Sequence, residues 1–304
     1  MSTMVCLMGE QPIPVLLPVR HINPQKTLLV CTRDTKAVAG RLAGLVPSAE
    51  TLVVPPYDVG RALTQMKQAA ALEGELIVNL TGGTKLMALA AYSLAAERRC
   101  DFVYLDSQQR RSLLYRYRFD SPTPSQATVT ELDTLINLDD YLRAHLPGYS
   151  AEGFSKEKNG QLTDGGRFEK AVHDALDRRG FEVLAGVRPQ GVEEQIEIDL
   201  VVRVGNQVGI AEIKLGDAQN KANKEALDQL TTAGSREYLG TYTARFLITA
   251  RPIHANGIRA LAQAMGIAII ELGDYNGGLT LSLASAERLA ESVRARLSPA
   301  KDRR

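Results

Sequence analysis

Short apolar runs that suit β-strands alternate with segments of helical spacing through the first part of this chain. The apolar runs are Val5–Met8, Leu28–Thr32, Thr51–Val54, Leu76–Leu80, Phe102–Leu105 and Leu113–Phe119. The segments with helical spacing are Lys36–Leu45, Val59–Leu72 and Thr84–Glu97. Apolar strands joined by helices are typical of parallel sheets covered on both faces, so the pattern predicts a Rossmann-like sheet. Ligands of such sheets bind at the carboxyl ends of the strands.

A run of serine and proline at residues 121–125 interrupts this alternation. We therefore expect an N-terminal domain over residues 1–125, a connector over 126–160 and a second α/β domain over 161–304. The second domain is expected to have the order αβββαβαβ. Its expected elements are Phe168–Arg179, Phe181–Val187, Ile196–Val204, Gln207–Leu215, Lys221–Tyr238, Arg245–Thr249, Ala255–Met265 and Ala268–Glu271.

Composition excludes several classes of protein. The chain has 304 residues with 36 basic and 35 acidic side chains, which is typical of an ordinary globular protein and excludes a disordered or fibrous one. Its three scattered cysteines cannot form a disulfide framework or a four-thiolate zinc site, so we expect a cytoplasmic protein. No apolar run approaches the length of a membrane span, so no membrane partner is expected.

Two carboxylates are expected to face each other in the second domain. Gly205-Asn206 is a two-residue hairpin signal, and it pairs Val204 with Gln207. Asp199 then lies opposite Glu212, and Glu197 lies opposite Lys214. Like charges placed in this way destabilise a hairpin unless a cation lies between them. Carboxylate oxygens suit Mg²⁺ or Mn²⁺, and Lys214 can orient an attacking water, so the cluster indicates metal-assisted phosphodiester hydrolysis. The alternative is a solvated hairpin face with a Glu197–Lys214 ion pair.

These residues resemble the PD-(D/E)xK nuclease superfamily, with Glu169 as the acidic residue of the preceding helix. The resemblance implies that Asp199, Glu212 and the Ile213 carbonyl bind the metal. It also implies that Lys214 assists the nucleophilic water and that Glu169 supports the metal or its waters. Gln229, on the following helix, matches a position that contacts the site in some branches.

A second motif, Asn79-Leu80-Thr81-Gly82-Gly83-Thr84-Lys85, follows a strand and opens a helix. Its glycines allow backbone amides to approach a ligand, and a helix N-terminus attracts anions, so it predicts a phosphate-binding turn. It matches neither the Walker nor the dinucleotide-binding pattern. The alternative is a glycine turn in which Thr84 only caps the helix.

This motif, together with MVCLMGEQPIP at the start and INLDDYL in the connector, resembles the cyclic-oligoadenylate-activated CARF nucleases of type III CRISPR systems. The resemblance implies a homodimer that binds a cyclic oligoadenylate, usually the tetramer, as an allosteric activator. It also implies cleavage of single-stranded RNA or DNA, or nicking of duplex DNA, with manganese or magnesium. The ligand contacts it implies are Gly9, Glu10, Gln11, Thr32, Arg33, Thr35, Thr81, Gly82, Gly83, Thr84 and Lys85.

Two other functions stay open at this point. One is a constitutive repair or restriction-like nuclease whose first domain is a scaffold. The other is a nucleotide-sensing regulator without catalysis, in which the carboxylate cluster is a structural hairpin. Nuclease activity in the absence of any nucleotide would favour the first of these functions.

Overall fold

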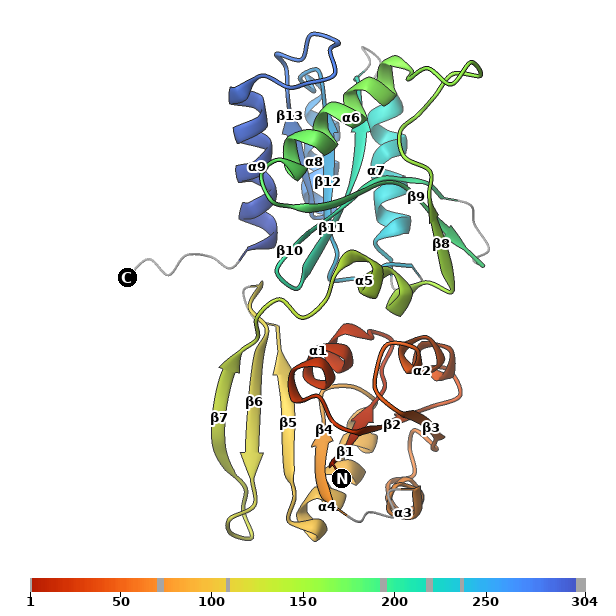
Figure 1. The fold of residues 1–304 in the computed structure, drawn as a ribbon, viewed down its shortest axis with the longest axis vertical. Coiled ribbons are helices and arrows are strands. Elements are labelled where there is room, and N and C mark those ends of the chain that lie inside the picture. Colours follow the sequence, from red (N-terminus) through yellow and green to blue (C-terminus); the bar gives the residue numbers. More distant parts are fainter. Residues whose placement is uncertain are drawn as a thin grey trace. The chain divides into compact units, whose positions relative to one another are not determined.

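The computed structural model describes residues 2–69, 74–107, 110–191, 196–216, 221–235 and 238–298. The chain forms two compact units, Met1–Ile136 with Arg143–His145, and Asn137–Leu142 with Leu146–Arg304. Each unit contains one mixed β-sheet with helices packed against it (Figure 1).

The sheet of the first unit has the strand order β3-β2-β1-β4-β5-β6-β7. Its strands are β1 (Ser2–Leu7), β2 (Lys26–Cys31), β3 (Ala49–Val53), β4 (Glu75–Asn79), β5 (Asp101–Asp106), β6 (Leu113–Arg118) and β7 (Ser125–Glu131). The first five strands are parallel, as the alternating pattern predicts. The last expected strand, β6, is instead antiparallel, as is β7. The chain between β5 and β6 is too short for the crossover that a parallel strand needs.

The helices of the first unit are α1 (Ile13–Ile22), α2 (Lys36–Ala43), α3 (Val59–Ala69) and α4 (Lys85–Arg98). A hydrophobic core on one face of the sheet joins Val5 and Val78 to Met66 of α3 and to Met87 and Leu94 of α4. All five of these side chains are fully buried. This core fixes the start of α4, which lies directly after the carboxyl end of β4 in the chain.

The sheet of the second unit has the order β13-β12-β11-β10-β9-β8. Its strands are β8 (Gly148–Ala151), β9 (Glu182–Gln190), β10 (Ile198–Val204), β11 (Gln207–Lys214), β12 (Ala244–Thr249) and β13 (Ile267–Glu271). The antiparallel hairpin of β10 and β11 pairs Val204 with Gln207 and Leu200 with Ala211, so the expected register is confirmed. The hairpin is central, because β9 extends it on one side and the parallel strand β12 on the other (Figure 1).

Helix α5 (Leu138–His145) has its residues divided between the two units. The other helices of the second unit are α6 (Asp164–Asp177), α7 (Lys221–Ala233), α8 (Asn256–Ala264) and α9 (Leu283–Leu297). A hydrophobic core joins Leu200 and Ile213 of the hairpin to Phe168 of α6 and to Leu289 and Val293 of α9. The order from α6 to β13 is the predicted αβββαβαβ, and α9 follows it. Burying one such large apolar side chain stabilises the fold by roughly 1.5–3 kcal/mol.

Residues 126–160, expected as a connector, carry secondary structure of their own. β7 pairs with β6 in the first sheet and β8 pairs with β9 in the second, while α5 lies between them in the chain. None of the helices within the described residues is long and apolar enough to cross a membrane.

Candidate functional site

The β10–β11 hairpin brings Asp199, Glu212 and Lys214 together. The Lys214 ammonium lies 2.9 Å from Glu212 Oε2 and 3.4 Å from Asp199 Oδ2. The backbone amide of Ile213 donates to the same Asp199 oxygen at 2.7 Å, which fixes the orientation of that carboxylate. Glu212 is only 2% exposed. The hairpin therefore holds two carboxylates and one ammonium in a single buried cluster.

The charges of this cluster shift one another's protonation. Burial raises the pKa of Glu212 to about 8; the Asp199 carboxylate adds to the increase, and Lys214 offsets part of it. Burial alone would lower the pKa of Lys214, but the carboxylates of Asp199 and Glu212 outweigh it and raise that pKa. The Lys214 ammonium thus supplies positive charge between the two opposed carboxylates.

Glu169 reaches the cluster from α6. Ser155 holds its carboxylate, with the backbone amide donating to Oε2 at 2.9 Å and the hydroxyl to Oε1 at 2.8 Å. Burial raises the pKa of Glu169, and the nearby charge of Asp199 raises it further, whereas the bonds from Ser155 and the charge of Lys214 lower it. The structure therefore places Glu169 within electrostatic reach of Asp199 and Lys214.

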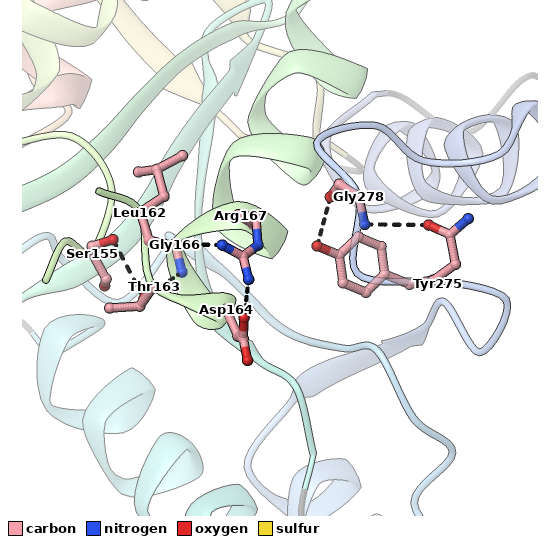
Figure 2. Close-up of polar contacts among 9 residues, drawn as sticks. Ser155, Leu162, Thr163, Asp164, Gly166, Arg167, Tyr275 and Gly278 are labelled. Carbon is pink, nitrogen blue, oxygen red and sulfur yellow. Dashed lines mark hydrogen bonds and ion pairs between the residues drawn. The ribbon is translucent and has the colours of Figure 1, made fainter. Parts of the chain in front are cut away.

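Figure 2 shows the polar contacts at the start of α6, the helix that carries Glu169. Thr163 caps the helix by accepting from the Gly166 amide at 2.9 Å, and the Arg167 side chain contacts Asp164 and the Leu162 carbonyl. A Cβ atom on Gly166 would lie 2.0 Å from the Ser155 carbonyl oxygen. Only glycine allows this approach, which brings Ser155 against the helix. Sequence reasoning missed Ser155, because no local pattern marks a loop serine that contacts a helix 14 residues further on.

Glu197 forms its ion pair with Arg188 and not with Lys214. Arg188 of β9 donates to Glu197 through Nη2 at 2.6 Å and also forms an ion pair with Glu152. Glu197 precedes the first residue of β10, and strand β9, on the side of β10 away from β11, supplies the arginine. The Glu197–Lys214 ion pair expected of a solvated hairpin face is therefore absent. Lys214 instead forms ion pairs with Asp199 and Glu212. Gln229 is exposed on α7.

The cluster offers two carboxylates to a divalent cation. Within the described residues, no group of three or more His, Cys, Asp or Glu side chains is arranged as a metal site. Asp199 and Glu212 are a set of two carboxylates, and magnesium is commonly bound through one or two carboxylates with several waters. Burial raises the pKa of Glu212, and the charge of Asp199 raises it further, so a cation beside both carboxylates would stabilise their ionised forms. The donor set thus fits magnesium or manganese.

In the first unit, the glycine turn lies against the end of β1. A Cβ atom on Gly82 would lie 2.0 Å from the Leu7 carbonyl oxygen, so no other residue fits there. Gly83 has a positive φ of 74° and would bring a Cβ atom 3.1 Å from the Leu7 side chain. These contacts place the turn beside Gly9, as the predicted grouping of strand ends requires.

The threonine hydroxyls of the turn have partners inside the protein. Thr84 accepts from the Met87 amide at 3.2 Å as the N-cap of α4 and donates to the Pro56 carbonyl at 2.8 Å. Thr81 donates to the buried Asn79 side chain at 2.6 Å and accepts from the Leu105 amide at 2.8 Å. Thr84 therefore does cap the helix, and both hydroxyls shape the turn.

The other expected ligand contacts differ in accessibility. Thr32 and Thr35 are buried, and their hydroxyl oxygens lie 3.3 Å apart while Thr35 also donates to the Met8 carbonyl. The exposed side chains are those of Glu10, Arg33 and Lys85, whereas Gln11 is half-buried. Lys85 stands at the first position of α4, so its ammonium and the helix N-terminus lie at the same end of the sheet.

The two units define a class of protein, in which a Rossmann-like domain is joined to a second domain with a mixed α/β fold. Residues 3–141 match the family model of the Card1 CARF domain. The N-terminal domain is therefore a CARF domain, as the sequence motifs predict. Among curated proteins, none matches this chain.

Solved structures share the fold of nearly the whole chain. Can2 from Sulfobacillus thermosulfidooxidans, solved with cyclic tetra-adenylate, is 16% identical with a TM-score of 0.72 and covers 97% of this chain and 99% of its own. Protein VC1899 from Vibrio cholerae is 13% identical with a TM-score of 0.70 and covers 96% of both chains. A type III CRISPR defence DNA nuclease activated by cyclic oligoadenylate is 16% identical with a TM-score of 0.63. That match covers 98% of this chain and 52% of the nuclease.

Proposed function

We propose that this chain is a metal-dependent nuclease of type III CRISPR defence that a cyclic oligoadenylate activates. The observation that carries the proposal is the buried cluster of Asp199, Glu212 and Lys214 on a central hairpin, in a chain whose other domain is a CARF domain. The likeness to Can2 with cyclic tetra-adenylate supports that ligand as the activator.

Each residue of the cluster has a role in this proposal. Asp199, Glu212 and the Ile213 carbonyl would hold magnesium or manganese, which when bound supplies positive charge to the scissile phosphodiester. Lys214 would direct its ammonium toward the attacking water or the charge that develops on phosphorus. Glu169, held by Ser155, would position waters around the metal.

The first domain would bind the ligand mainly through its backbone. Because the hydroxyls of Thr81 and Thr84 are engaged inside the protein, the amides of Gly82 and Gly83 and the Lys85 ammonium remain as contacts for phosphate. We infer a homodimer, since a cyclic ligand with its own symmetry is matched by two copies that present the same strand ends. Activation then requires tighter binding of the ligand to the active arrangement.

The direct test is cleavage of single-stranded RNA, single-stranded DNA and duplex DNA with Mn²⁺ or Mg²⁺, with and without cyclic tri-, tetra- and hexa-adenylate. We expect cleavage only when both metal and one of the cyclic ligands are present. Cleavage without any nucleotide would support a constitutive nuclease. Ligand binding without cleavage under any condition would support a regulator that has no catalysis.

Variants separate the two sites. Glu212→Gln and Lys214→Ala should abolish cleavage and leave ligand binding intact, and the exposed Glu291→Gln is the matched control that should keep both. Lys85→Ala should weaken binding of the cyclic ligand, whereas Arg98→Ala, at the other end of α4, should not. Unchanged affinity in Lys85→Ala would contradict the assignment of the turn.

A further inference from the structure

Arg251 lies beside the Lys214 end of the carboxylate cluster and has no role in the function proposed above. Strand β11 pairs Lys214 with Thr249 of β12. The pairing continues past both strand ends, because the Ala250 amide donates to the Lys214 carbonyl at 3.1 Å. One pair further on, a Cβ atom on Gly216 would lie 3.2 Å from the Cβ atom of Arg251. Gly216 and Arg251 are therefore neighbours, as the register of the two strands requires.

The glycine leaves the space at this strand end to Arg251. Gly216 has a φ of 84°, in the left-handed region that favours glycine. A side chain there would also crowd the stem of Arg251. Side chains two positions apart on a strand share a face, so the row of β12 that contains Thr249 continues with Arg251. Lys214 is in register with that row.

The guanidinium of Arg251 is available to bind an anion. The side chain is exposed, and within the described ranges it forms no ion pair or hydrogen bond. Two other arginines of the second unit, Arg178 and Arg296, are also exposed and unpaired over these ranges. They stand at the carboxyl ends of α6 and α9, where the helix dipole stabilises positive charge. Arg251 follows a strand, so no helix end accounts for its charge.

The other flank of the cluster, toward β9, carries excess negative charge. Ile198 of β10 pairs with Val187 of β9, and one position further Glu197 forms an ion pair with Arg188 at 2.6 Å. Glu152 forms a second ion pair with the same guanidinium at 2.7 Å. Two carboxylates against one guanidinium repel a phosphate backbone. The charges on the two flanks therefore favour a nucleic-acid strand on the β12 side.

We propose that Arg251 binds the phosphate next to the scissile one, so that the nucleic-acid strand leaves the cluster across the carboxyl end of β12. Two residues of extended chain span about 6.5 Å, which separates Arg251 from the row of Lys214. A guanidinium binds phosphate through two parallel hydrogen bonds. Lys214 then faces the scissile phosphate and Arg251 faces its neighbour. The inference rests on the proposed function for the class of substrate and adds the residue that sets the path of the strand.

The test measures binding of fluorescein-labelled single-stranded RNA and DNA by anisotropy, with cyclic tetra-adenylate present. The protein is the full chain with Glu212→Gln, which is expected not to cleave. Adding Arg251→Ala should weaken binding of the better-bound strand about tenfold. The slope of log affinity against log salt should become shallower by about 0.7, the value for one phosphate contact on a single strand.

Further variants separate a phosphate contact from a structural role or a general effect of surface charge. Arg251→Lys should keep the salt slope and recover part of the affinity, because it keeps the charge without the planar fork. Arg178→Ala and Arg296→Ala are the matched controls and should bind as the Glu212→Gln protein does. The melting temperature of Arg251→Ala should equal that of its background, since the side chain is exposed.

Cleavage kinetics without the Glu212→Gln change supply a second measurement. Arg251→Ala should raise KM about tenfold and leave kcat within about twofold, because the contact is the same in the ground state and the transition state. Unchanged affinity and salt slope in Arg251→Ala, with a parent that cleaves, overturn the role of Arg251 and leave the proposed function standing. An equal loss of affinity in Arg178→Ala or Arg296→Ala also overturns it. A parent that neither binds nor cleaves nucleic acid overturns both.

Discussion

The buried carboxyl of Glu212 lies where its charged form costs stability. Its carboxyl is 2% exposed and lies beside Asp199, so the folded protein disfavours its charged form. Lys214 compensates only in part, since the pKa of Glu212 remains raised. A divalent cation would complete the compensation, which is the reason to place it at this cluster.

The pKa of Glu212 gives a prediction for stability. The folded-state pKa of about 8 exceeds the ordinary value of 4.5. The contribution of this carboxyl to the free energy of unfolding is therefore fully present below pH 4.5 and is lost as the pH rises toward 8. Without metal, Glu212→Gln should therefore be more stable than the parent at pH 7.5, by on the order of 1–3 kcal/mol, and the difference should shrink at pH 5. Urea unfolding in EDTA measures it, with Glu291→Gln as control. A difference that is the same at both pH values would contradict the raised pKa.

Gly82 gives a second prediction at this scale. An added Cβ would lie 2.0 Å from a backbone oxygen of β1, which cannot move without disturbing the sheet. Gly82→Ala should destabilise the first domain by roughly 1–3 kcal/mol and weaken binding of the cyclic ligand. Gly40→Ala, in α2 with nothing within 4 Å of the new Cβ, should instead leave stability unchanged or raise it. The denaturant midpoints of the two variants measure this difference in stability. Equal midpoints would contradict the close approach of Gly82 to the Leu7 carbonyl oxygen.

At the scale of elements, the sequence predicts strands and helices with strong periodicity and misses those with unusual composition. The hairpin register followed from Gly205-Asn206 alone, because a two-residue turn fixes the pairing. Helix α1 was missed because Pro14 and Pro18 argue against a helix, yet burial of its apolar residues stabilises it. β7 was missed because it is an exposed edge strand of mostly polar residues.

The site shows the same division. Asp199, Glu212 and Lys214 could be predicted together because they share one hairpin. The partner of Glu197 could not, since Arg188 comes from a strand whose neighbours are fixed only by the folded sheet. The same holds for Ser155, whose position against Glu169 depends on the packing of a loop on α6.

Helix α5 carries a prediction of its own, because its residues are divided between the two units. Asn137 caps it by accepting from the Asp140 amide at 2.7 Å, and the Asp140 side chain accepts from the Asn137 amide in return. Asn137→Ala should weaken the helix by about 1 kcal/mol, whereas Asn137→Asp should preserve it. Amide hydrogen exchange over residues 138–145 reports the change. We also expect the alanine variant to lower ligand-stimulated cleavage more than ligand affinity, and equal protection in all three proteins would argue against the cap.

At the scale of the molecule, each unit has its own hydrophobic core. The core with Leu94 of α4 lies in the first unit and the core with Leu289 of α9 in the second, and the described members of the two cores do not overlap. Allosteric activation needs a coupling free energy of only ~1–3 kcal/mol, which is small beside the stability of a domain. Separate cores are therefore compatible with a ligand signal that passes between the domains.

Separate cores also predict separate unfolding. Calorimetry should show two unfolding transitions, one for each domain. Leu94→Ala should lower the free energy of unfolding of the first domain, and Leu289→Ala that of the second, each by roughly 2–5 kcal/mol. Under the proposed function, cyclic tetra-adenylate binds the first domain. At 100 times its Kd it should therefore raise the free energy of unfolding of that domain, whose transition Leu94→Ala lowers, by about 2.7 kcal/mol. Mn²⁺ should raise the unfolding temperature of the second domain in the parent and not in Glu212→Gln. A single transition that responds to both additives would mean that the domains unfold as one unit and that the coupling between them exceeds the usual range.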